Sequence, residues 1–181
     1  MPVDTRLTYD DFCLLPDDGK RREIIEGELY VTPSPLTPHQ RAVMRLSIRL
    51  GHFVESHKLG ELFGAPLDVV FSKFDVVEPD LLFISNARAG VLTNKNVQGA
   101  PDLVVEILSE STARVDRSIK LNLYGKFGVL EYWIIDPEGS SAEIYRRGEG
   151  GLDLAAKLSA ADALTSPMFP GFSVPLHELI E

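Results

Sequence analysis

The chain has 181 residues, of which 44% are hydrophobic and 25% charged, a length and composition typical of one globular domain. Its formal net charge of −9 argues against strong non-specific binding to nucleic acid, although a local basic stripe can coexist with an acidic whole. No run approaches the roughly 18 apolar residues of a membrane span, the polar first residues lack a signal-peptide core, and the single cysteine, Cys13, excludes an intramolecular disulfide. We expect one cytoplasmic domain over residues 1–181.

The N-terminal elements are predicted to be a short helix and a β-hairpin. Thr8 is a suitable cap for a helix over 8–15. Polar and apolar residues then alternate on both sides of Glu26-Gly27, a dipeptide that favours a tight turn. This pattern predicts paired strands over 22–25 and 28–31.

A long helix is predicted after the proline-rich connector. Thr37 is its expected N-cap, Pro38 fits the first helical position, Gln40 would complete a capping box, and Gly60 would end the helix. Its apolar stripe comprises Val43, Leu46, Leu50, Phe53 and Val54.

Three arginines, Arg41, Arg45 and Arg49, lie four residues apart along one side of this predicted helix. Such a row is either a solvated face or a stripe that contacts DNA phosphates. The two interpretations differ in whether the arginines gather near an active site.

The rest of the chain alternates apolar strands with one further helix. The predicted elements are strands over 61–71 and 79–84, a loop over 86–99 that could include a helical turn, a strand over 102–108, a helix over 114–127, a hairpin over 131–135 and 142–146, and short strands after Leu152. This order predicts an α/β or α+β domain, with a mixed central sheet and helices packed against it.

Two acids stand out because of their apolar neighbours. Glu106 lies inside the run 103–108, where an unpaired carboxylate is costly to bury. Asp80 precedes the apolar strand that begins after it. Acids on adjacent core strands can converge on one hard cation, since Mg²⁺ is held by one or two carboxylates and substrate oxygens. Alternatively, Asp80 could bond its own backbone, and Glu106 could pair with an arginine.

The helix over 114–127 places two more charged residues beside the sheet. On a helical wheel Asp116 and Lys120 fall among the residues of the packed face. Lys120 would then need a negative partner, for which Glu106 is the obvious candidate. The alternative is an exposed pair between Asp116 and Lys120, four residues apart.

These residues carry a family resemblance. Glu78-Pro79-Asp80 followed by Glu106 resembles the PD…(D/E)XK signature of restriction-endonuclease-like enzymes. The chain is similar, more closely, to the Uma-two family of predicted restriction endonucleases, once described as a domain of unknown function. The matching blocks are residues 22–29, 78–83, 100–109, 128–137 and 170–175, so that the resemblance covers almost the whole chain.

The resemblance implies a restriction-endonuclease-like core and a metal-dependent cut in DNA. Asp80 and Glu106, with the carbonyl of Ile107, would hold Mg²⁺, for which Mn²⁺ could substitute. One position departs from the signature, because Leu108 stands where the lysine is usual. Lys120 on the following helix would have to replace that lysine.

Three further residues are candidates for the same site. Glu23 matches a recurrent acidic position of the family and could complete the metal site. His39 opens the long helix, where it could meet a phosphate or be a helix-start residue without a catalytic role. Asp68 lies on the predicted strand before Asp80, where it could contact the residues that hold the metal without binding the metal itself.

Three functions remain open on the sequence. The first is a metal-dependent DNA endonuclease, acting alone or as a homodimer that addresses both strands. The second is a nuclease-like fold that binds or assembles without cutting, which the net charge and Leu108 favour. The third is a hydrolase of a small phosphorylated molecule. No membrane partner is expected.

Overall fold

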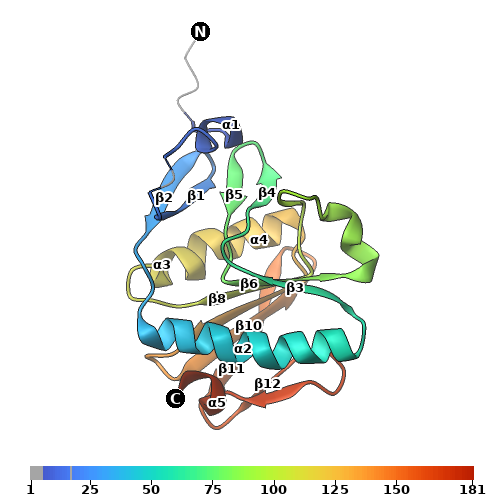
Figure 1. Ribbon diagram of the computed structural model, residues 1–181. Coiled ribbons are helices and arrows are strands. Elements are labelled where there is room, and N and C mark those ends of the chain that lie inside the picture. The colour runs from blue at the N-terminus through green and yellow to red at the C-terminus, as the bar shows by residue number, and fades with distance from the viewer. Residues whose placement is uncertain (1–5, 17) are drawn as a thin grey trace.

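The structure, a computed structural model, describes residues 6–16 and 18–181 (Figure 1). The strands are β1 Arg21–Ile25, β2 Glu28–Thr32, β3 Gly60–Gly64, β4 Val69–Ser72, β5 Asp75–Val77, β6 Leu81–Ser85, β7 Val97–Gln98, β8 Leu103–Ile107, β9 Glu131–Asp136, β10 Ser141–Arg147, β11 Leu152–Ser159, β12 Ala163–Thr165 and β13 Ser173–Pro175. The helices are α1 Tyr9–Phe12, α2 Thr37–Ser56, η1 Asn86–Val91, α3 Ala113–Val115, η2 Asp116–Lys120, α4 Leu121–Phe127 and α5 His177–Ile180.

A mixed six-stranded sheet in the order β11-β10-β9-β8-β6-β3 forms the centre of the molecule. Strands β8 and β9 run parallel, and the other neighbours are antiparallel. Figure 1 shows α2 on one face of this sheet and α4 on the other. The predicted α/β class with helices against a mixed sheet is therefore confirmed.

Strand β8 lies between two apolar clusters because its side chains alternate between the two faces. Leu103, Val105 and Ile107 pack in the cluster that contains residues of α2. Val104 and Leu108 pack in the cluster that contains residues of α4. Glu106 therefore projects toward the helix that carries Lys120, as the alternation requires.

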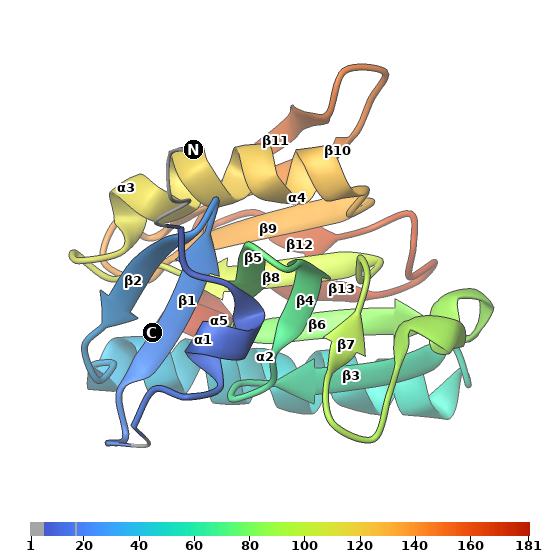
Figure 2. The ribbon, with the colours of Figure 1, turned by 90° about the horizontal axis from the view of Figure 1, so that it is seen from above.

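A second sheet, ordered β2-β1-β5-β4-β7, stands beside the central one (Figure 2). Its hairpin β1–β2 turns at Glu26-Gly27, where φ is +55° and +83°, the left-handed values that a tight hairpin turn needs. The predicted hairpin is thus confirmed. The predicted helical cap at Thr8 is also confirmed, and forms a capping box with Asp11, but the helix ends at Phe12.

Two predictions for this part of the chain were wrong. The strand expected over 61–71 is divided. Strand β3 ends at Gly64, and Pro66, which lacks a backbone donor, comes two residues later; the chain then enters the second sheet as β4. Strand β5, which pairs with β1 and β4, was missed, since its three residues adjoin a turn. Both errors concern segments that change from one sheet to the other.

The start of α2 also differs from the prediction. Leu36 is the N-cap, in extended conformation and without a side-chain hydrogen bond, and Thr37 is already helical. The predicted capping box with Gln40 is therefore absent from this helix. Of the predicted stripe, Leu46, Leu50 and Val54 are buried, while Val43 and Phe53 pack at the edge of the core. No helix in the described ranges 6–16 and 18–181 is long and apolar enough to cross a membrane.

Candidate active site

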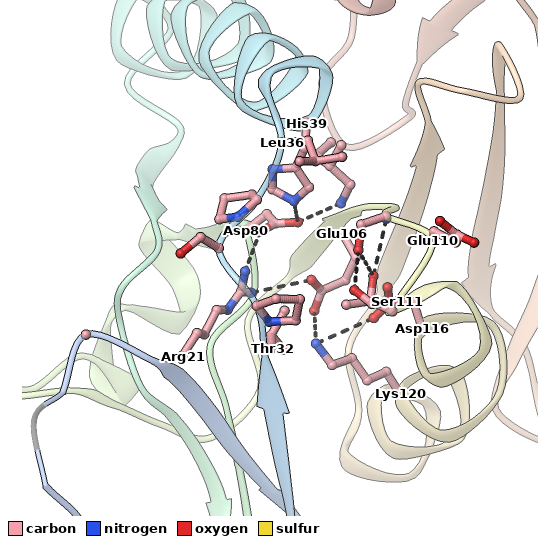
Figure 3. Close-up of a pocket in the computed structure, with 17 residues that line it drawn as sticks. Arg21, Thr32, Leu36, His39, Asp80, Glu106, Glu110, Ser111, Asp116 and Lys120 are labelled. Atoms are coloured by element: carbon pink, nitrogen blue, oxygen red, sulfur yellow. Dashed lines mark hydrogen bonds and ion pairs between the residues drawn. The ribbon is translucent and has the colours of Figure 1, made fainter.

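A cavity of about 600 Å³ opens where the hairpin β1–β2, the start of α2, the end of β8 and the start of the α3–η2–α4 helix meet (Figure 3). Among the residues predicted for the site, Asp80, Glu106, Ile107, Lys120 and His39 line it. The structure thus brings together side chains that are up to 81 positions apart (His39 to Lys120).

Asp80 lies just before β6 and is 4% exposed. Its Oδ2 accepts from the backbone N–H of Ile107 at 2.7 Å and lies 3.1 Å from Nε2 of His39. Its Oδ1 accepts from Nη1 of Arg21 at 2.7 Å. Burial alone would raise its pKa, but the hydrogen bond with His39 and the charge of Arg21 outweigh burial and hold the pKa at about 2. Asp80 is therefore ionised at neutral pH.

Glu106 is 2% exposed on β8. Its Oε1 accepts from Nζ of Lys120 at 2.9 Å and from the hydroxyl of Tyr124 at 2.7 Å. Burial raises its pKa to about 8; Lys120 opposes this rise, and the negative charges of Asp116 and Asp80 add to it. Near neutral pH, this part of the cluster therefore tends to retain a proton.

Lys120 reaches the site from a π-helical turn, η2, inside an otherwise continuous helix. Such turns occur frequently at functional sites. Its Nζ lies 2.9 Å from Oε2 of Glu23, 2.9 Å from Oε1 of Glu106 and 3.5 Å from Oδ1 of Asp116. Burial would lower its pKa, but these carboxylates raise it above the ordinary value, so Lys120 stays charged. The placement of Asp116 and Lys120 on the packed face is confirmed.

Three further acids, Glu23, Glu78 and Asp68, lie around Asp80, Glu106 and Lys120. Glu23 is 2% exposed and, besides Lys120, accepts from the backbone N–H of Glu78 at 2.9 Å. Burial and then the neighbouring charge of Asp68 raise the pKa of Glu78 to about 7. Asp68 itself accepts from the hydroxyl of Tyr9 at 3.0 Å and does not line the cavity. Asp68 therefore adjoins the site through Glu78 rather than taking part in it.

Arg21 was not predicted as a site residue. It lies on β1 between Asp80 and Glu106, with Nη2 3.7 Å from Oε2 of Glu106 (Figure 3). In the sequence, Lys20-Arg21-Arg22 next to a turn resembles a solvated charge run. The available signal was strand alternation, since Arg21 and Glu23 share one face of β1.

The three arginines of α2 lie away from the cavity. Arg41 and Arg45 donate to backbone carbonyls of α5 and of the residue after it, and Nη2 of Arg49 lies 2.6 Å from Oε2 of Glu178. These contacts fasten the C-terminal helix to α2. Contact of these arginines with DNA stays a prediction. Their position beside α5, rather than near the cavity, does not favour it.

The donor set of the cavity fits an oxygen-liganded divalent cation. Five carboxylates pair with two buried or part-buried cations, Arg21 and Lys120. Asp80, Glu106 and Asp116 line the cavity, and Glu23 and Glu78 lie next to these residues. Oδ1 of Asp116 is buried without a hydrogen-bond partner. In the part of the chain that the structure describes, no three His, Cys, Asp or Glu side chains form a ready-made metal site. Mg²⁺ commonly takes only one or two carboxylates and completes its shell with water and phosphate oxygens.

A family model described as Uma2, putative restriction endonuclease, matches residues 9–177. The chain belongs to the Uma2 family. A crystal structure of a putative nuclease belonging to DUF820 from Anabaena variabilis ATCC 29413 has the same fold, with a TM-score of 0.80 and 21% identity over 96% of this chain and 97% of that chain. A comparison with curated proteins gives no match. The resemblance drawn from the sequence blocks and the restriction-endonuclease-like fold are confirmed for this Uma2 protein.

Proposed function

We propose that this Uma2 protein is a metal-dependent endonuclease that hydrolyses DNA phosphodiester bonds in the cavity beside Asp80 and Glu106. The observation that carries the proposal is the 2.9 Å contact between Lys120 and Glu106, which supplies a charged lysine although position 108 holds leucine. Membership of a family described as putative restriction endonucleases, and a fold shared with a solved protein described as a putative nuclease, support the same reaction class.

The carboxylates of Asp80 and Glu106, together with the carbonyl of Ile107, would hold Mg²⁺, and Mn²⁺ would substitute for it. When bound, such an ion polarises a phosphate and lowers the pKa of its water. His39 and the N–H of Ile107 both contact Oδ2 of Asp80, and so fix the orientation of this carboxylate. Glu106 is fixed in the same way by the hydroxyl of Tyr124.

Lys120 would act as a hydrogen-bond donor rather than as a base, because its raised pKa keeps it protonated. A protonated amine beside the scissile phosphate orients the attacking water and stabilises the negative charge that develops on the phosphate oxygens. Glu23, 2.9 Å from the same Nζ, would keep Lys120 directed into the cavity. Glu23 is thus a positioning residue in this proposal.

A binding module without catalysis is the second candidate. It is favoured by Leu108, which is 4% exposed and packed in the apolar core, and by the resident cations that already pair with Asp80 and Glu106. A two-fold symmetric homodimer would be compatible with either function, because it could contact both strands of duplex DNA.

A cleavage assay separates the two candidates. Supercoiled plasmid and circular single-stranded DNA would be incubated with the protein in Mg²⁺, in Mn²⁺ and in chelator, alongside Asp80→Asn and an Arg88→Gln control. Arg88 pairs with Asp102 at 3.4 Å and does not line the cavity. We expect metal-dependent cutting that Asp80→Asn removes and Arg88→Gln keeps. DNA binding without cutting by the wild type would reject the endonuclease and favour the binding module.

A further inference from the structure

The guanidinium of Arg21 occupies the space between the two carboxylates of the site (Figure 3). Nη1 donates to Oδ1 of Asp80 at 2.7 Å, and Nη2 lies 3.7 Å from Oε2 of Glu106. Nη2 also donates to the carbonyl of Glu78. Nε is buried without a hydrogen-bond partner, 3.9 Å from the carboxylate of Glu78. The guanidinium of Arg21 therefore interacts with three carboxylates, although its Nε lacks a hydrogen bond.

The other oxygens of the two carboxylates are already engaged. Oδ2 of Asp80 contacts the N–H of Ile107 and His39, at 2.7 and 3.1 Å. Oε1 of Glu106 accepts from Lys120 and Tyr124. The oxygens left to face one another are Oδ1 of Asp80 and Oε2 of Glu106, and Arg21 contacts both. A cation shared by Asp80 and Glu106 would have to approach the position that the guanidinium now holds.

We propose that Arg21 is a resident counter-ion that competes with a divalent cation for Asp80 and Glu106. The inference rests on the proposed function, because it assumes that these two carboxylates are the metal ligands. Arg21 neutralises part of the buried negative charge while the metal is absent, and its positive charge weakens metal binding. The side chain lines the open cavity and is 22% exposed, so it has room to move aside.

Mn²⁺ titrations by calorimetry test the competition. Arg21→Gln removes the charge but keeps an amide that can donate to Asp80, and Arg88→Gln removes an equal charge from a similarly exposed arginine outside the cavity (22% and 30% exposed). We expect Arg21→Gln to bind Mn²⁺ about tenfold more tightly than the wild type, since a like charge leaves the site. Arg88→Gln should bind as the wild type does. Equal or weaker binding by Arg21→Gln would overturn the proposal.

A second variant covers the case in which Arg21→Gln does not fold without metal. Arg21→Lys keeps a charge for folding but is shorter and has a single charged nitrogen, so its contact with Glu106 should weaken. Its Mn²⁺ affinity should exceed that of the wild type, while Arg88→Lys stays unchanged; no increase would contradict the competition.

Asp80→Asn and Glu106→Gln separate this inference from the proposed function. If both remove Mn²⁺ binding but Arg21→Gln does not increase it, only the role of Arg21 fails. If Mn²⁺ binding survives both, or the wild type and Arg21→Gln both fail to bind, the metal site fails and the inference fails with it.

Discussion

Two buried glutamates on adjacent parallel strands, Glu106 on β8 and Glu131 on β9, are each 2% exposed but have different surroundings. Glu131 accepts from Nε1 of Trp133 at 2.9 Å and the hydroxyl of Ser166 at 2.6 Å, and lies 3.4 Å from Nε of Arg146. Within residues 6–16 and 18–181, no second carboxylate pairs with Trp133, Ser166 or Arg146. Glu106 shares Lys120 with Glu23 and Asp116 and borders a cavity of about 600 Å³.

The difference shows how a structural acid can be told from a functional one. A buried acid whose oxygens all have hydrogen bonds from neutral donors or a contact with one cation stabilises the packing around it. A buried acid among like charges costs stability, and such a cluster beside a cavity is typical of sites that bind a cation or perform chemistry. The surroundings of Glu106 are of the second kind, and those of Glu131 are of the first.

Glu106→Gln should have the largest effect. We expect DNA cleavage to fall by a factor of about 10³ or more, because the substitution removes a proposed ligand of the metal that would stabilise the transition state. The fold should be kept, since glutamine has the same shape and can still accept from Tyr124. Cleavage rates and circular dichroism spectra would be measured beside Glu131→Gln. Equal cleavage by wild type and Glu106→Gln would remove the functional distinction between the two glutamates.

Lys120→Met should have the second-largest effect on cleavage. Cleavage should fall by about 10²-fold through loss of the proposed donor to the phosphate. Mn²⁺ binding should be kept or become tighter, because a positive charge beside Glu106 is removed. The metal-free protein should lose about 3 kcal/mol of unfolding free energy, because Glu23 and Glu106 lose their shared cation. Urea unfolding and calorimetry measure the two effects separately. Loss of Mn²⁺ binding together with stability would show that the lysine has a structural role only.

Glu106 should make the stability of the metal-free protein depend on pH. The pKa of Glu106 is raised from 4.5 to about 8, so the folded protein retains a proton that the unfolded chain releases between these values. The metal-free protein should therefore lose stability as pH rises from about 4.5 to 8, and Glu78, with its pKa raised to about 7, adds to this loss. Urea midpoints measured at pH 5.5 and at pH 8 in chelator should differ less in Glu106→Gln than in the wild type. An undiminished difference in Glu106→Gln would show that another group carries it.

Glu131→Gln should have the smallest functional effect. Replacing the charged acceptor leaves Arg146 and Ser166 with a poorer partner, and the free energy of unfolding should fall by about 1–2 kcal/mol. Mn²⁺ affinity and cleavage rate should stay at the wild-type values. A marked loss of either, with the stability unchanged, would mean that the site extends across the sheet to β9.

The elements that one local pattern specifies could be predicted from the sequence. The hairpin at Glu26-Gly27 and the buried strand β8 follow from turn chemistry and an apolar run. By contrast, no local pattern predicts that the chain passes from one sheet to the other near Pro66. The sheet that a strand joins depends on partner strands that are distant in sequence. Thr37 was expected to be a cap because of its residue type, yet Leu36 takes that position through its backbone alone.

The site shows the same division. Glu106 and Lys120 could be selected because each is a charged residue at an apolar position of its element, and Asp80 because it directly precedes an apolar strand. Arg21 could not, since its neighbours in sequence are charged and its partner Asp80 lies 59 residues away. The net charge of −9 also concealed that a basic side chain lies at the centre of the acidic cluster.

A calorimetric titration of Mn²⁺ into the wild type, Asp80→Asn, Glu106→Gln and Glu131→Gln would show whether Asp80 and Glu106 form one cation site that does not include Glu131. We expect the wild type and Glu131→Gln to bind one ion with equal affinity, and Asp80→Asn and Glu106→Gln not to bind it. Binding that survives in both Asp80→Asn and Glu106→Gln would show that these two carboxylates are not the cation site.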